Sequence, residues 1–223
     1  TPDKKRKQSA AEELTNCKKS RNDTQNTLSL NEVINLGIPH VGELIFESID
    51  TPGLIKCLEV SETWKVLAGN ALIKRWKGKM YEAFMEACCD GHKDVVQLLL
   101  NHSERIELNA RTNTGQTAFM ITCKKGHKDA VELLLDHSER IEMNTRTNNG
   151  WTAFMWACSR GHKDVVKLLL DHFERIELNA RNNNGMTAFL WACFDGCKDI
   201  VQLFLGHSDR IELNARKTDI GFT

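Results

Sequence analysis

The 223-residue sequence is poor in proline, balanced in charge and free of long apolar runs. It has 3 prolines, none after residue 52, which excludes a proline-rich ligand and permits long helical stretches. Its 30 basic residues equal its 30 acidic ones, so it lacks the cationic excess that binding to nucleic-acid phosphates requires. No apolar run reaches the ~18 residues of a membrane-spanning helix. These absences disfavour nucleic acid and a membrane as partners.

Eight cysteines are present, but half of them recur at one spacing instead of forming metal-ligand pairs. Cys88, Cys123, Cys158 and Cys193 lie 35 residues apart in apolar stretches. The ligands of one metal must converge on one point, so we predict packed thiols, no metal and no cofactor. The first residues contain no apolar secretory segment, and disulfides belong mainly to secreted proteins. We therefore expect reduced thiols in the cytoplasm, the nucleus or both.

Composition divides the chain into three parts, at residues 1–30, 31–79 and 80–223. Residues 1–30 carry 7 basic and 4 acidic residues and few large apolar ones, which predicts a basic disordered tail. Arg6-Lys7 and Lys18-Lys19-Ser20-Arg21 are spaced as in a bipartite nuclear-import signal, and a merely solvated tail explains them equally well. Residues 31–79 do not repeat, whereas residues 80–223 do.

The repeat has a period of 35 residues, marked by Gly-His-Lys-Asp at Gly91, Gly126 and Gly161 and by Gly-Cys-Lys-Asp at Gly196. Thr152 is placed to cap a short helix that ends before Gly161. Residues 165–170 then supply the apolar stripe of a second helix, with an acidic residue in its first turn. Residues 175–178 alternate between charged and apolar, which predicts a short extended stretch, and residues 183–185 form the turn to the next unit.

This unit resembles the ankyrin repeat, whose pattern is Gly-x-Thr-Pro-Leu-His-x-Ala-x-x-x-Gly-His. Residues 150–162 read Gly-Trp-Thr-Ala-Phe-Met-Trp-Ala-Cys-Ser-Arg-Gly-His, with Ala in place of Pro and Met in place of His. The period exceeds the usual ~33 residues, and we expect the extra residues in the Ser-Glu-Arg-Ile stretch. Four copies cover residues 80–214 and the start of a fifth follows, so we expect a longer natural protein. The resemblance implies an all-α solenoid of helix-turn-helix units with projecting turns.

Residues 36–76 resemble the F-box, a short helical module that docks on a Skp-type adaptor of cullin ubiquitin ligases. The resemblance is clearest at Val60-x-x-x-Trp64 followed by Leu67-Ala68. Pro39 suits a helix start and Pro52-Gly53 a break, which predicts about three short helices. The resemblance implies that the adaptor contacts apolar residues of this segment: Ile38, Pro39, Leu44, Ile45, Phe46, Ile49, Leu54, Ile55, Val60 and Trp64.

Ankyrin arrays bind partners through their turn tips and the exposed ends of their first helices. Carried over to this sequence, the resemblance implies a target-binding set of Asn113, Gln116, Lys124, Lys125, Asn148, Trp151, Arg160, Asn183, Met186, Phe194 and Asp195. Trp151 suits partner binding and packing between repeats equally well. Trp156 and Trp191 occupy a position that is usually a buried leucine, so we assign both to the core.

No catalytic constellation accompanies these features. The chain lacks G-x-x-x-x-G-K-[ST], H-E-x-x-H and G-x-S-x-G motifs, and its periodic histidines have no nucleophile repeated beside them. We assign the histidines to loop hydrogen bonds and predict a protein that is not an enzyme. Together the resemblances imply the substrate-recognition adaptor of a Skp–cullin–F-box ubiquitin ligase, whose array binds an unidentified target protein. The alternative is an ankyrin scaffold or transcriptional regulator that binds a protein partner without recruiting a ligase.

Overall fold

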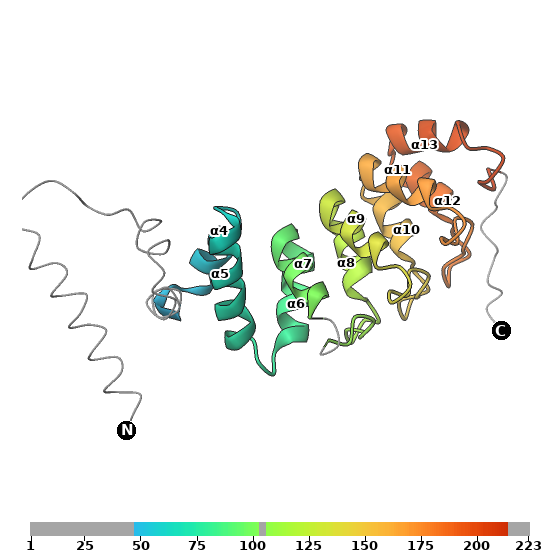
Figure 1. Ribbon diagram of the computed structural model, residues 1–223. Coiled ribbons are helices and arrows are strands. Elements are labelled where there is room, and N and C mark those ends of the chain that lie inside the picture. Colours follow the sequence, from blue (N-terminus) through green and yellow to red (C-terminus); the bar gives the residue numbers. More distant parts are fainter. Residues whose placement is uncertain (1–46, 103–105, 214–223) are drawn as a thin grey trace, which may run out of the picture. The chain divides into compact units, whose positions relative to one another are not determined.

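The computed structural model describes residues 47–102 and 106–213, and every regular element in these ranges is an α-helix. The prediction of an all-α helical array is thus confirmed. The chain divides into two compact units, Thr1–Lys74 and Arg75–Thr223, and Figure 1 shows their helices in sequence order. No helix in the described ranges is long and apolar enough to cross a membrane.

The first unit contains α4 (Thr51–Cys57) and α5 (Glu62–Arg75). The Asp50 carboxylate caps α4 by accepting a hydrogen bond from the Gly53 N–H at 3.0 Å. Pro52 stands in the first turn of α4, where its missing N–H is harmless. The helices bury a small set of side chains at 0–4% exposure: Leu54, Leu58, Ala68 and Leu72. Among the described residues of this unit, the large apolar side chains left exposed are Val60 and Val66.

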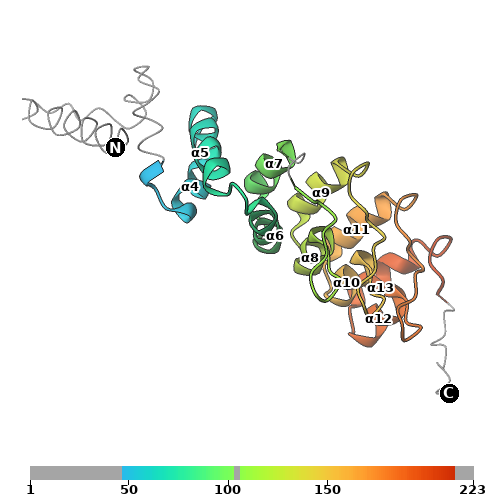
Figure 2. The same ribbon diagram turned by 90° about the horizontal axis from the view of Figure 1, so that it is seen from below.

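The second unit contains four helix pairs, each copying the one before it. The pairs are α6 (Met80–Asp90) with α7 (Lys93–Asn101), α8 (Ala118–Lys125) with α9 (Lys128–Asp136), α10 (Ala153–Ser159) with α11 (Lys163–Asp171), and α12 (Ala188–Phe194) with α13 (Lys198–Leu205). First helices pack on first helices and second helices on second helices, so the array has two layers (Figures 1 and 2).

Threonine caps explain where the first helices begin. The Thr152 hydroxyl accepts a hydrogen bond from the Met155 N–H at 3.3 Å, as the sequence predicts. Thr117 and Thr187 do the same for α8 and α12. In the second helices the apolar stripe is buried, for example at Val166 and Leu169 with 0% exposure. The predicted acidic residue in the first turn of α11 is Asp164.

An asparagine ladder joins each copy to the next. The side chain of Asn109 donates from Nδ2 to the Arg140 carbonyl at 2.9 Å and accepts from the Glu142 N–H at 2.9 Å. Asn144 and Asn179 make the same pair of bonds to the copies that follow them. The ladder therefore holds the backbone of the stretch where we expected the extra residues of the period.

The predicted extended stretch at residues 175–178 is wrong: it folds as bends and turns, not as a strand. Ile176 and Leu178 are nevertheless buried, at 7% and 8% exposure. The backbone of this stretch bonds to the side chain of Asn144 instead of to a neighbouring strand. The alternation of charged and apolar residues in this stretch therefore indicates that every second side chain is buried. A turn can bury alternate side chains as well as a strand can.

Histidines after the inter-helix glycines form a second link between copies. His127 Nε2 lies 2.8 Å from the Cys89 carbonyl and His162 Nε2 lies 2.9 Å from the Lys124 carbonyl, which confirms the predicted loop role of these two residues. A Cβ on Gly91 would come within 2.4 Å of the His127 ring, so only glycine fits there. In the fourth copy Cys197 replaces the histidine, and its Sγ lies 3.6 Å from the Ser159 carbonyl.

We expect Cys197→His to stabilise the array by about 1 kcal/mol, because it replaces a weak sulfur contact with an imidazole hydrogen bond. Gly161, like Gly91 and Gly126, leaves room for the ring. Urea unfolding near pH 8 measures the free energy of unfolding. His162→Cys is the matched control and should lose a similar amount. A Cys197→His variant no more stable than the wild type would contradict the role of this link.

Three of the periodic thiols lie in the core, as predicted, and the fourth does not. Cys88, Cys123 and Cys158 are 0% exposed, whereas Cys193 is exposed because no described copy packs against α12 from its far side. Burial raises the pKa of the Cys88 thiol from 9.0 to about 12 and raises the pKa values of Cys123 and Cys158 as well. In the described ranges no group of three His, Cys, Asp or Glu side chains could hold a metal.

We expect the array to lose stability as the pH rises above about 9, because the unfolded chain then releases thiol protons that the folded chain retains. Each of the three buried thiols should contribute up to about 1.4 kcal/mol per pH unit to this loss. Urea unfolding between about pH 8 and pH 10 measures the slope. A variant with alanine at positions 88, 123 and 158 starts from lower stability but should show a shallower slope, and equal slopes would contradict the expectation.

Candidate protein-binding surface

The turn tips between successive helix pairs are linked to one another. The Asn148 side chain donates from Nδ2 to the Asn113 carbonyl, and Asn183 donates likewise to the Asn148 carbonyl, both at 3.0 Å. The backbone N–H of Asn148 also donates to the Thr114 carbonyl at 3.2 Å. All three asparagines are exposed. The side-chain amide donors of Asn148 and Asn183 therefore bond within the array, although both residues are exposed.

Three indole rings from two adjacent copies stack on this side of the array. The Trp151 ring lies between those of Trp156 and Trp191, with centroid distances of 4.2 Å and 4.6 Å and interplanar angles of 29° and 38°. All three are half-buried. The assignment of Trp156 and Trp191 to the core is thus wrong, because Trp151 reaches across from the turn and covers them in place of a neighbouring helix. For Trp151, packing between repeats is now observed.

Cations and a phenyl ring border the stacked indoles. Lys124 Nζ lies 4.2 Å from the centroid of the Trp156 ring, and the Arg160 guanidinium carbon lies 5.8 Å from it. Phe194 meets the Trp191 ring edge-on, at a centroid distance of 5.6 Å, and is 76% exposed. We call these six side chains the aromatic–cationic surface: Lys124, Trp151, Trp156, Arg160, Trp191 and Phe194.

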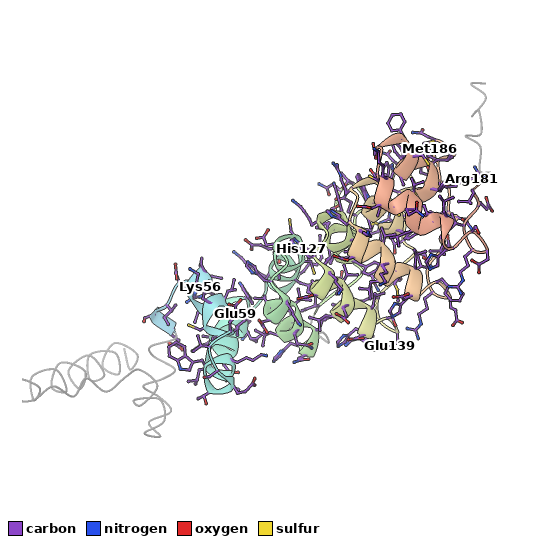
Figure 3. All side chains as sticks on the ribbon, turned by 90° about the horizontal axis from the view of Figure 1, so that it is seen from above. Lys56, Glu59, His127, Glu139, Arg181 and Met186 are labelled. Atoms are coloured by element: carbon purple, nitrogen blue, oxygen red, sulfur yellow. The ribbon has the colours of Figure 1, made fainter. Side chains whose placement is uncertain are left out.

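The remaining members of the predicted target-binding set surround this surface or lie along the same tips. Asp195 accepts a hydrogen bond from the Ser159 hydroxyl at 2.6 Å, across two copies. Lys125 is exposed, whereas Gln116 and Met186 are half-buried. Met186 projects from the C-terminal part of the array in Figure 3. The same figure places His127 and Glu139 at opposite edges of the array, consistent with their positions before and after α9.

A family model described as ankyrin repeats in three copies matches residues 61–147 and 139–217. The chain belongs to the ankyrin-repeat family. Its array is therefore a protein–protein interaction module, and the expectation of a protein partner holds at this level. No F-box family model matches, and the ankyrin match overlaps the F-box-like segment at residues 61–79. No curated protein matches the chain.

The predicted adaptor-binding residues have different environments in the first unit. Ile38, Pro39, Leu44, Ile45 and Phe46 lie outside the described residues. Leu54 is fully buried within the unit, so it supports the fold and presents no surface. Ile49, Ile55 and Trp64 are half-buried, and Val60 is 54% exposed.

Sequence reasoning missed that Trp156 and Trp191 stack with Trp151 and are only half-buried. The sequence did contain a sign that these positions are not in the core, because at the 35-residue spacing they correspond to Glu86 in the first copy. A position that accepts glutamate in one copy is not a core position in the next. Glu86 is indeed exposed, and Ile121 in the second copy is half-buried.

We expect Trp151→Ala to lower the stability of the array by about 2 kcal/mol, because it removes the ring that the other two indoles stack on. Phe194→Ala should change the stability by less than about 0.5 kcal/mol, since that ring is mostly in solvent. Thermal and urea unfolding of both variants measure the difference. Equal stability losses in the two variants would contradict the observed packing.

Proposed function

We propose that this protein is the substrate-recognition adaptor of a Skp–cullin–F-box type ubiquitin ligase. The ankyrin array holds the target protein, and the segment at residues 31–79 recruits the Skp-type adaptor. The chain itself performs no chemistry. The chain raises the local concentration of the target beside the ligase and orients the target. The reaction itself is carried out by partner enzymes, and it is faster because its reactants are held close together.

The observation that supports target binding is the exposure of Phe194. A phenyl ring that is 76% exposed beside a stacked indole contributes little to folding. Aromatic side chains and arginine are enriched among the residues that dominate binding energy at protein interfaces. The aromatic–cationic surface combines both kinds of residue on one face of the array. Its composition is thus typical of an interface rather than of solvent-exposed helices.

The first unit also presents apolar side chains to solvent, which supports a second partner there. Val60 and Val66 are 54% and 60% exposed. Val60 begins the Val60-x-x-x-Trp64 pattern that resembles the F-box, and Val66 lies on α5 two residues after Trp64. A module with so small a core gains stability when a partner covers such residues.

The second candidate is an ankyrin scaffold or transcriptional regulator that recruits no ligase. The extent of the family match favours it. The matched residues begin at 61 and include α5, the helix that carries Trp64. The ankyrin match thus includes α5 in the array. If α5 serves as an array helix, residues 31–79 no longer form a separate adaptor-binding module.

A co-purification experiment separates the two candidates. In the full-length chain, Val60→Asp with Val66→Asp should reduce the yield of a co-expressed Skp-type adaptor at least about tenfold, because the charges would be buried at its interface. Gln202→Asp with Ser208→Asp makes the same charge change at exposed positions of the array and should leave the yield unchanged. An unchanged yield in the valine variant, or no adaptor with either protein, would contradict ligase recruitment and favour the scaffold.

A further inference from the structure

The aromatic–cationic surface offers hydrogen-bond donors and cations but no acceptor. Lysine, arginine and tryptophan side chains donate only, and phenylalanine does neither. Lys124 and Arg160 both carry a positive charge and both lie by the Trp156 ring. The Asp195 carboxylate, which accepts the Ser159 hydroxyl, follows Phe194 in the chain, so the positive charge of this surface belongs to Lys124 and Arg160. A ligand that fits this surface must therefore bring the acceptors and the negative charge.

Two indole N–H groups strengthen this requirement. Trp156 Nε1 and Trp191 Nε1 are covered within the stack, and neither has a hydrogen-bond partner among the described residues. A covered donor without an acceptor costs free energy in the unbound protein. A ligand acceptor that reached either N–H group would recover that cost.

The faces of the Trp151 and Trp156 rings are already occupied, which disfavours two other kinds of ligand at these two rings. Trp151 has an indole on each side, and Trp156 has Trp151 and the Lys124 ammonium beside it. A nucleic-acid base needs a free face to stack on, and a quaternary ammonium group needs an aromatic cage without a resident cation.

The chain's own N-terminal tail does not fit either. Residues 1–30 carry 7 basic and 4 acidic residues, so the tail has the same sign of charge as Lys124 and Arg160. What remains complementary is a segment of another protein with carboxylates for the two cations and a large apolar side chain for Phe194.

We infer that the aromatic–cationic surface binds an acidic linear segment of a partner protein, in which a large apolar residue stands beside aspartate or glutamate. The carboxylates pair with Lys124 and Arg160, and the apolar side chain packs on Phe194 and the edges of the indoles. This inference rests on the proposed target binding by the array and names the chemistry of the target. It does not depend on recruitment of a ligase.

Selection from a library of random linear peptides tests the inference with the full-length chain as bait. Enriched peptides should contain aspartate or glutamate next to phenylalanine, tryptophan or leucine. Their dissociation constants, measured by fluorescence polarisation, should rise with salt because the contacts are ionic and exposed. Lys124→Gln with Arg160→Gln should weaken binding at least about tenfold, and Phe194→Ala should weaken it by about the same factor. Lys167→Gln, an exposed charge on α11, is the control and should change nothing.

The outcomes separate this inference from the proposed function. Enriched peptides that are neutral or basic, or that bind the Lys124→Gln, Arg160→Gln variant as tightly as the wild type, would overturn the inference while leaving target binding by the array intact. A single-stranded oligonucleotide that competes with the peptides at this surface would also overturn it. Failure to enrich any peptide would count against both.

Discussion

Side-chain hydrogen bonds to the backbone of a neighbouring copy hold this array together. A pair of helices nine residues long or less, such as α10 and α11, cannot bury its apolar side alone, so each copy depends on the next. Asn109, Asn144 and Asn179 fix the spacing on one side of the helices, and His127 and His162 fix it on the other. With both ends of the first two interfaces set in this way, the thiols and leucines between the helices pack in one register.

This division explains why the framework repeats and the surface does not. The asparagines, histidines, threonine caps and glycines recur in nearly every copy because each of them bonds to or packs against a neighbouring backbone. The position at the end of the first helix, which is half-buried in three copies and exposed in the fourth, reads Cys89, Lys124, Ser159 and Phe194 in successive copies. The array thus keeps its geometry constant while the side chains at these positions change from copy to copy, and the aromatic–cationic surface includes two of them, Lys124 and Phe194.

The sequence predicts the framework well because every framework element is periodic. The helix starts at Thr152, the break at Gly161 and the buried thiols at Cys88, Cys123 and Cys158 all follow from residues that recur at one spacing. The stacked indoles could not be predicted in the same way, since Trp151, Trp156 and Trp191 come together only through contacts between copies, and two of them look like substituted core residues. Cys193 follows the period but not the burial, because it lies in the last described copy. For the F-box-like segment, five of the ten predicted contact residues lie outside the described ranges.

The cysteine at position 197 gives the array a weaker link between its third and fourth copies. In a linear array the local free energy of opening depends on the interfaces that join neighbouring copies. With sulfur in place of imidazole, α12 and α13 are held less tightly than the pairs before them. Phe194 stands on α12 and Asp195 directly after it, so part of the aromatic–cationic surface lies on the copy that this weaker link holds. A bound partner that contacts both Arg160 and Phe194 would stabilise the packing of α12 and α13 on the copy before them. Amide hydrogen exchange in α12 and α13 would then slow on binding more than exchange in α8 and α9.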